Sequence, residues 1–189
     1  VLSAQTTAIT ITDVNDQTPA ATVTDTYTVA ENTATVASIS ITDTDTSGTL
    51  TCSVAGTDNA LFTCTVSGTT ATVAFASAPN FESPGDAGTN NVYDITVTFT
   101  DGTNTLSPQT TAVTVTDTND QTPTYTPNSV TKSVAEGSGV AIDQFTITDT
   151  DASGTLTCTE SGADASDFAC GISGTTLTIT WSAAPDYDS

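Results

Sequence analysis

Residues 12–19 read Thr-Asp-Val-Asn-Asp-Gln-Thr-Pro, and residues 116–123 read Thr-Asp-Thr-Asn-Asp-Gln-Thr-Pro, so that Asp13 and Asp117 stand 104 residues apart. The match continues downstream with offsets of 105 and then 106 residues. The matched pairs include Glu31 with Glu136, Asp43 with Asp149, Asp45 with Asp151, Cys52 with Cys158 and Cys64 with Cys170. Self-similarity at a fixed period predicts tandem copies of one structural unit.

The repeat also sets the expected domain boundaries. Leu2-Ser3-Ala4-Gln5-Thr6-Thr7 matches Leu106-Ser107-Pro108-Gln109-Thr110-Thr111, so we expect residues 1–16 to be the last strand of a preceding repeat. Residues 17–120 then form one complete repeat, and residues 121–189 form the next repeat, truncated before its last two strands. We expect the chain to be a window cut from a longer array.

The apolar residues of the complete repeat alternate with Thr, Ser or Ala, which is the period of a β-strand with one buried face. Alternating positions are Ile39 and Ile41, Val73 and Phe75, Ile95, Val97 and Phe99, and Val113 and Val115. Gly, Asn, Asp and Pro clusters separate these segments. The pattern predicts an all-β fold of tandem Greek-key antiparallel β-sandwich repeats, each with about seven strands. Trp181 stands in the place of Phe75 and is predicted to be a core residue.

The charge of the chain excludes several classes of partner. It has 1 Lys+Arg and 22 Asp+Glu, a formal net charge of −21. Nucleic acids and anionic membrane surfaces are bound through Lys and Arg, and only Lys132 is present, so neither is an expected partner. The 36 % of hydrophobic residues suffice for folded cores. The many Thr residues suit polar strand faces, and a dense coat of O-glycans is the alternative.

Acidic and amide residues recur in the turns and linkers between the predicted strands. Carboxylate, amide and backbone oxygens are ligands for calcium, whereas a zinc site requires Cys or His. The chain has no His. Calcium ions are therefore the favoured cofactor, and the alternative is that these acids are solvated turn residues.

The four cysteines form one pair per predicted repeat, and both pairs have a separation of 12 residues: Cys52 with Cys64 and Cys158 with Cys170. Matched pairs in a chain that reads as secreted favour one disulfide in each repeat. Such a bond would contribute on the order of 3 kcal/mol. Two reduced core cysteines per repeat are the alternative.

Five motifs in a fixed order resemble cadherin repeats. They are Asp-x-Asn-Asp before the junction proline, Val-Ala-Glu-Asn at 29–32, Asp-Thr-Asp-x-Ser-Gly at 43–48, Pro-Asn-Phe-Glu at 79–82 and Tyr-x-Ile-Thr-Val-x-Phe-Thr-Asp-Gly at 93–102. The insertion that follows Glu82 resembles the bacterial cadherin-like type. The resemblance covers essentially the whole chain.

The resemblance implies calcium at each junction between repeats. For the junction at 117–120, the implied ligands are Glu31, Glu82, Asp117, Asn119, Asp120, Asp149 and Asp151. For the junction at 13–16, they are Asp13, Asn15, Asp16, Asp43, Asp45 and Asp101. Like charges at such a junction repel by about 1 to 4 kcal/mol per close pair, and roughly three divalent ions would neutralise the six carboxylates at 117–120. Asn80 replaces the Asp usual in the family, which lowers the charge of its site.

No catalytic constellation is present in the sequence: there is no His base, no nucleophile with a paired base and no phosphate-binding loop, so we do not expect an enzyme. The resemblance implies an extracellular structural or adhesive stalk on a microbial cell surface, stiffened by calcium, whose tip ligand binds outside this segment. Its partners would be neighbouring repeats of the same protein. Two alternatives remain: a repeat unit of a self-assembling extracellular filament with strand exchange between copies, and a carbohydrate-binding module of a secreted enzyme.

Overall fold

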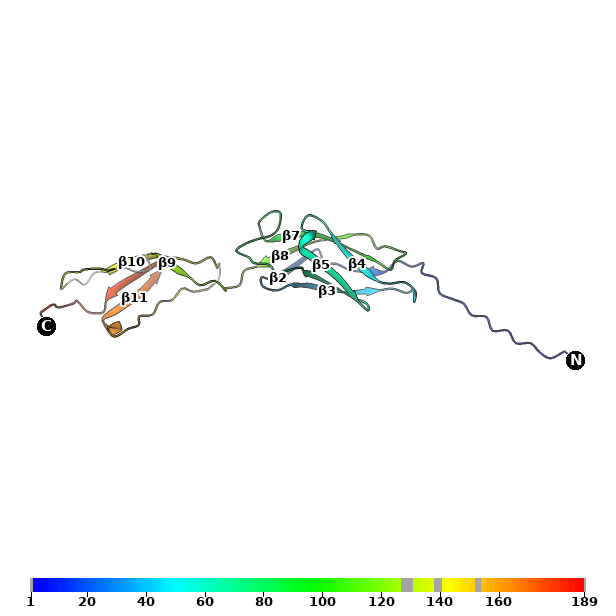
Figure 1. The fold of residues 1–189 in the computed structure, drawn as a ribbon, viewed down its shortest axis with the longest axis horizontal. Helices are drawn as coiled ribbons and strands as arrows, with labels where there is room; N and C mark the ends of the chain where they lie inside the picture. The colour runs from blue at the N-terminus through cyan, green and yellow to red at the C-terminus, as the bar shows by residue number, and fades with distance from the viewer. Residues whose placement is uncertain (1, 127–130, 138–140, 152–153, 189) are drawn as a thin grey trace. The chain divides into compact units, whose positions relative to one another are not determined.

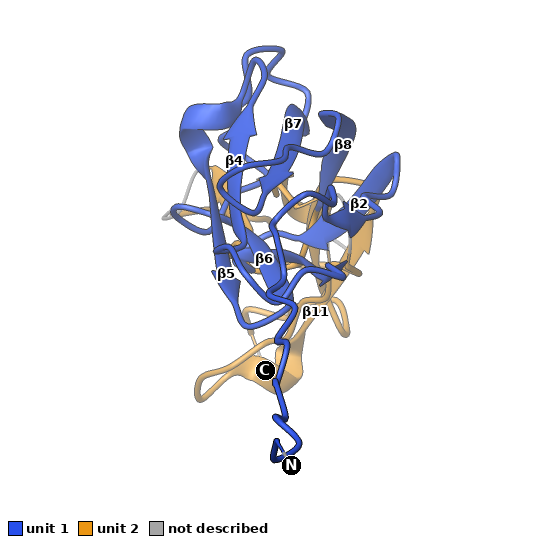
Figure 2. Ribbon diagram, turned by 90° about the vertical axis from the view of Figure 1, so that its right-hand side faces the viewer, with its two compact units in different colours: residues 1–116 blue, residues 117–189 orange. Residues whose placement is uncertain are grey.

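The structure is a computed structural model that describes residues 2–126, 131–137, 141–151 and 154–188. The chain divides into two compact units, which are residues 1–116 (unit 1) and residues 117–189 (unit 2), coloured separately in Figure 2. Each unit consists of β-strands and one short 3₁₀ turn in its described part. Among the described residues, no helix has the length and apolarity needed to cross a membrane.

Unit 1 is a sandwich of two four-stranded sheets (Figure 1). The first sheet, in spatial order, is β1 (Ala20–Ala21), β3 (Thr35–Thr42), β6 (Thr70–Phe75) and β5 (Phe62–Ser67). The second sheet is β2 (Thr26–Ala30), β8 (Gln109–Thr116), β7 (Val92–Thr100) and β4 (Thr51–Ala55). Strands β2 and β8 pair in parallel, whereas the other neighbours pair antiparallel. The 3₁₀ turn η1 (Asn59–Leu61) precedes β5.

The core of unit 1 lies between the two sheets. The alternating residues that the sequence singled out face inward, and Val113 and Phe99 are completely buried. Three aromatic rings meet at one end of this core: Phe75 lies 4.4 Å from Phe62 and 5.1 Å from Tyr93 between ring centroids. The strand prediction is therefore confirmed for β3, β6, β7 and β8, because a period of two places one side chain in every pair between the sheets.

Unit 2 contains one four-stranded sheet within its described residues. In spatial order it comprises β11 (Phe168–Ser173), β12 (Thr176–Trp181), β10 (Ala141–Thr148) and β9 (Thr124–Thr126), with the 3₁₀ turn η2 (Ala165–Asp167) before β11. By the sequence repeat, these strands are the counterparts of the first sheet of unit 1. Phe168 stacks on Trp181 with ring centroids 4.6 Å apart, and the equivalent rings of Phe62 and Phe75 are tilted by 33° with centroids 4.4 Å apart. Unit 2 thus repeats one layer of the sandwich.

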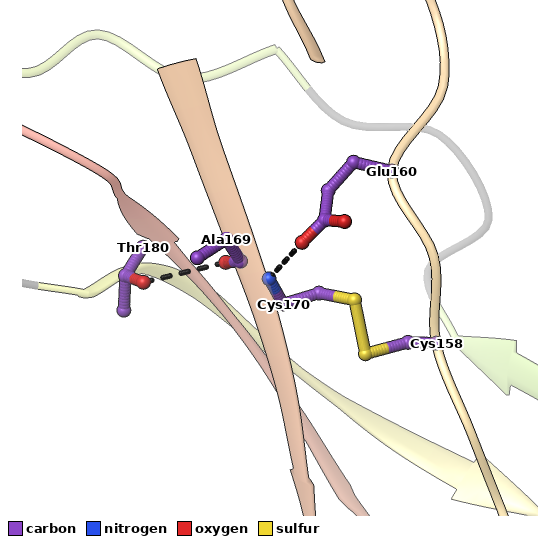
Figure 3. The surroundings of a disulfide bond; sticks show 5 residues. All are labelled: Cys158, Glu160, Ala169, Cys170 and Thr180. Carbon is purple, nitrogen blue, oxygen red and sulfur yellow. Dashed lines mark hydrogen bonds between the residues drawn. A yellow bond between two sulfur atoms is a disulfide. The ribbon is translucent and has the colours of Figure 1, made fainter. Parts of the chain in front are cut away.

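Two disulfides have the predicted pairing, Cys52 with Cys64 and Cys158 with Cys170. In unit 1 the bond joins β4 to β5, and these strands are the edge strands of different sheets. In unit 2 the bond ties the segment that carries Cys158 to β11, as Figure 3 shows. The disulfide of unit 1 therefore links its two sheets, and the disulfide of unit 2 attaches a segment outside any strand to the edge strand β11.

Two features differ from the simple strand pattern of the sequence. Residues 2–16, predicted to be a strand of a preceding repeat, form no strand in the structure, and Ile9 and Ile11 are 87 % and 93 % exposed. The first strand of the repeat is also divided: β1 joins one sheet and β2 joins the other, which gives unit 1 eight strands instead of about seven.

Candidate metal centre

Three carboxylates converge at one end of unit 1. Asp43 and Asp45 lie in the loop that follows β3, and Asp101 follows the last residue of β7. One carboxylate oxygen from each of the three lies within 4.8 Å of the others. Asp101 is 2 % exposed, and the other two are half-buried. Because buried carboxylates require a counter-charge or hydrogen bonds, this cluster has the chemistry of a site for a hard cation.

The side chain of Asn15 completes the cluster from the linker. The side of its amide that faces the carboxylates lies 2.9 Å from Asp101 Oδ2 and 3.1 Å from Asp45 Oδ2. If the amide nitrogen lies on this side, it donates hydrogen bonds to both carboxylates. If the amide oxygen lies there, it accepts a hydrogen bond of 3.2 Å from Asn104 Nδ2, which also donates to Asp101 Oδ2 at 3.2 Å. In that orientation oxygens of Asn15, Asp45 and Asp101 face one another as a possible ligand set for a cation. The donor set fits calcium, whose preferred ligands in proteins are carboxylate and amide oxygens.

Asp101 is held in place by its own turn. Its Oδ1 accepts hydrogen bonds of 2.7 Å from the backbone N–H groups of Thr103 and Asn104. Its Oδ2 accepts a hydrogen bond of 3.2 Å from Asn104 Nδ2 and lies on the side of Asn15. Burial of Asp101 by itself would raise its pKa, but the hydrogen bonds from Asn104 and Thr103 outweigh it and lower the pKa from 3.8. The carboxylate is therefore ionised at neutral pH, as a metal ligand must be.

Asp13 and Asp16 take different positions from the carboxylates of this cluster. Asp13 Oδ2 accepts hydrogen bonds from the backbone N–H of Thr46 at 2.6 Å and from its hydroxyl at 2.8 Å. The backbone bond is the main reason that the pKa of Asp13 is lowered from 3.8. Asp16 Oδ1 accepts a bond from the side chain of Gln17. The structure therefore brings Asn15, but neither Asp13 nor Asp16, to the three converging acids.

The side chain of Asn15 packs against Gly48, a glycine in the Asp-x-Asp loop at 43–48. Gly48 has φ +106°, a conformation that L side chains rarely adopt, and a Cβ at this position would lie 2.5 Å from Asn15 Nδ2. Gly154 in unit 2 has φ +114°, and a Cβ there would lie 2.4 Å from Asn119 Nδ2. In both units the linker Asn therefore packs on a glycine that no other residue could replace without displacing the amide.

The contacts of the acidic loop also repeat in unit 2. The backbone N–H of Gln121 donates to Asp151 Oδ2 at 2.8 Å, and that of Gln17 donates to Asp45 Oδ2 at 2.7 Å. The N–H of Asp151 donates to Asp149 Oδ1 at 3.3 Å, and carboxylate oxygens of Asp120 and Asp151 lie within 4.8 Å of each other. Both units therefore hold the linker against the Asp-x-Asp loop in the same way.

Glu31 and Glu82, at the other end of unit 1, also come close to each other, with carboxylate oxygens within 4.8 Å. Glu31 is 2 % exposed, and its Oε2 accepts a hydrogen bond of 2.9 Å from the backbone N–H of Phe81. Their predicted association with the linker residues Asp117, Asn119 and Asp120 remains a prediction.

Sequence reasoning assigned no role to two buried acids, Asp58 and Asp86, at 6 % and 3 % exposure. Asp58 accepts hydrogen bonds from the backbone N–H groups of Ala87 at 2.9 Å and Asp94 at 2.7 Å. Asp86 accepts from those of Asn90 and Asn91. These carboxylates fold the insertion after Glu82 onto β7. The sequence signal was weak, because each partner is a backbone group that any residue provides.

No protein-family model matches the chain, and no curated protein matches it. Solved structures do match. The human desmocollin-1 ectodomain is similar with a TM-score of 0.64 and 17 % identity over 93 % of this chain and 35 % of that one. Human protocadherin-24 EC1-2 is similar with a TM-score of 0.60 and 18 % identity over 93 % of this chain and 81 % of that one. The structure of extracellular cadherin domains 1–4 of protocadherin gamma B7 is similar with a TM-score of 0.58 and 23 % identity, over 94 % of this chain and 44 % of that one.

The chain spans less than half the length of the desmocollin-1 and protocadherin gamma B7 structures. Both matches nevertheless cover more than 90 % of this chain, so each of them includes residues of both compact units. At these identities the likeness concerns the fold. The chain has a cadherin-like β-sandwich fold, as its five motifs predicted.

Proposed function

We propose that this chain is a section of an extracellular structural or adhesive stalk on a microbial cell surface, in which calcium stiffens tandem repeats. The proposal rests above all on one observation: Asn15, Asp43, Asp45 and Asp101 converge at one end of a sandwich. The ligand set predicted for the junction at 117–120 remains part of the proposal. Such a stalk is not an enzyme, and it would carry a binding tip that lies outside this segment.

The composition and the disulfides support an extracellular setting. The charge of −21 favours cations as partners over nucleic acid or anionic lipid. Disulfides persist in oxidising compartments and are rare in the cytosol. Both cysteine pairs are bonded, with no free cysteine among the described residues.

A calcium titration of the whole chain by calorimetry tests the proposal. The double variant Asp45→Asn/Asp101→Asn removes two carboxylates of the cluster and should weaken binding at that site about tenfold or more. The matched control Asp25→Asn/Asp94→Asn makes the same change in charge at two exposed acids outside the cluster, and it should leave binding unchanged. Equal calcium binding by both double variants would rule out the cluster as the site.

A further inference from the structure

Asn104 lies beside the acidic cluster of unit 1, three residues after Asp101, and it is half-buried. Its Nδ2 lies 3.2 Å from Asp101 Oδ2 and 3.4 Å from the backbone oxygen of Asn15. The same nitrogen lies 3.2 Å from the side-chain atom of Asn15 that faces the carboxylates. One amide group therefore contacts both the acid that follows β7 and the linker.

The first two contacts fix the orientation of the Asn104 amide. Carboxylate and backbone carbonyl oxygens only accept hydrogen bonds, so the NH₂ group of Asn104, and not its oxygen, must face Asp101 and the backbone oxygen of Asn15. An amide nitrogen only donates, so the third atom that it contacts must be an acceptor. The opposite orientation of Asn15 would place two amide nitrogens 3.2 Å apart with no acceptor between them. The atom of Asn15 beside the acids is therefore the oxygen Oδ1.

The other contacts of Asn15 agree with this orientation. Its Nδ2 then donates to the hydroxyl of Thr103 at 3.3 Å. Its Oδ1 lies 2.9 Å from Asp101 Oδ2 and 3.1 Å from Asp45 Oδ2. Two carboxylate oxygens and an amide oxygen at these separations repel one another unless a cation lies among them, and all three are oxygens of the kind that calcium binds.

We propose that Asn104 is a positioning residue of the calcium site in unit 1, because its NH₂ group holds the side-chain oxygen of Asn15 toward the carboxylates of Asp45 and Asp101. Asn15 then binds the cation through oxygen and does not satisfy the acids through nitrogen. Residues that orient metal ligands in this way typically contribute about 10- to 100-fold to metal affinity. This role of Asn104 rests on the calcium function proposed above, whereas the orientation of the Asn15 amide does not.

Hydrogen exchange of the side-chain amides, measured by NMR on the whole chain in chelator, tests the orientation. The NH₂ signals of Asn15 and Asn104 are assigned by their loss in Asn15→Leu and Asn104→Leu. The NH₂ group of Asn104 should exchange more slowly than that of Asn15, because the Asn15 group reaches only the hydroxyl of the exposed Thr103. Slower exchange of the Asn15 group in the wild type would overturn the proposal.

Asn104→Asp provides the reciprocal test in chelator. It keeps the size of the side chain and replaces the donor by an oxygen, so the amide of Asn15 should rotate and donate to the new carboxylate. The NH₂ group of Asn15 should then exchange more slowly than in the wild type. Unchanged exchange would show that Asn104 does not orient Asn15.

A calcium titration followed by NMR through the backbone N–H of Asp101 measures binding at this site. Asn104→Leu keeps the backbone N–H that bonds to Asp101 Oδ1, and it should weaken binding about 10- to 100-fold. Asn59→Leu, at an exposed Asn outside the cluster, is the matched control and should bind as the wild type does.

The ¹⁵N resonance of the Asn15 side chain gives a readout that a purely structural role of Asn104 would not change. Calcium should shift this resonance in the wild type and in Asn59→Leu, because a ligated amide oxygen withdraws electrons from its nitrogen. The shift should be lost in Asn104→Leu. Equal affinity and an equal shift in Asn104→Leu would overturn the role of Asn104 alone, whereas a wild type that binds no calcium would overturn the calcium function itself.

Discussion

The Asn15 side chain distinguishes a metal site from a hydrogen-bonded turn. Its amide lies within 3.1 Å of carboxylate oxygens of Asp45 and Asp101. In a hydrogen-bonded turn, either the amide nitrogen on that side donates to both carboxylates, or the amide oxygen there accepts from Asn104 Nδ2. A calcium site needs an oxygen there, and a carboxylate serves as well as an amide. Substitution at this one residue therefore separates the two accounts.

Asn15→Asp should keep calcium binding and lose stability without calcium. A fourth carboxylate repels the other three by about 1 to 4 kcal/mol per close pair until a cation neutralises them. Calcium should therefore raise the Tm of Asn15→Asp by more than it raises that of the wild type, as measured by calorimetry. Asn15→Leu, which removes the oxygen, should lose the calcium effect. If Asn15→Asp is destabilised equally with and without calcium, Asn15 is a hydrogen-bond donor.

Calcium affinity should hold steady as the pH falls from neutral into the mildly acidic range. Hydrogen bonds lower the pKa values of Asp13 and Asp101 from 3.8. Because its pKa is lowered, each of these two carboxyl groups stays ionised at pH values above 3.8. It becomes protonated only as the pH falls through the lowered pKa. Calcium titrations at about pH 7 and about pH 5 should therefore agree within a few-fold. A large loss by pH 5 would contradict the lowered pKa of Asp101.

Among the elements, β7 connects the core to the acidic cluster of Asp43, Asp45 and Asp101. Its residues Ile95, Val97 and Phe99 are at most 2 % exposed, and Asp101 follows directly after the strand. The start of β7 is fixed by Asp58, which accepts hydrogen bonds from the N–H groups of Ala87 and Asp94. The insertion after Glu82 is thereby folded against the strand that positions Asp101.

Asp58→Ala should lower the free energy of unfolding of unit 1 by about 2 to 4 kcal/mol, because it leaves two N–H groups without acceptors. Urea denaturation, followed by far-ultraviolet circular dichroism, measures the change. Asp25→Ala, at an exposed acid, is the control and should change little. A loss as small as that of the control would show that Asp58 does not hold the insertion.

Strands were predictable from the sequence where burial repeats every second residue. Ile39 and Ile41 or Val113 and Val115 need only a pleated backbone to reach the core. The division of the first strand was not predictable, because β1 pairs through Ala20 and Ala21 alone, too few residues for a period. The family motifs predict Asp43, Asp45 and Asn15 as calcium ligands.

Other contacts of the candidate site depend on backbone groups that the sequence does not mark. Asp13 caps Thr46, which is 33 residues away, and Asp58 bonds to Asp94 at a distance of 36 residues. Such pairs arise only once the loops are placed by the sheets. Predicting them from one sequence would require knowing the fold first.

On the scale of the whole chain, the same linker contact occurs twice in a strongly acidic protein. Both units hold the linker against an Asp-x-Asp loop through the same backbone contact, made by Gln17 and by Gln121. The chain carries a net charge of −21, and clustered carboxylates resist being held close without cations. We therefore expect calcium to control how freely successive repeats move.

Small-angle X-ray scattering of the whole chain, in calcium and after chelation, tests this claim most directly. The measurement is made at the lowest usable concentration, so that association between copies does not contribute. The account predicts a narrow distribution of interatomic distances in calcium, and a broader distribution with Kratky plots of a flexible particle in chelator. Identical distance distributions and flexibility in the two conditions would contradict it.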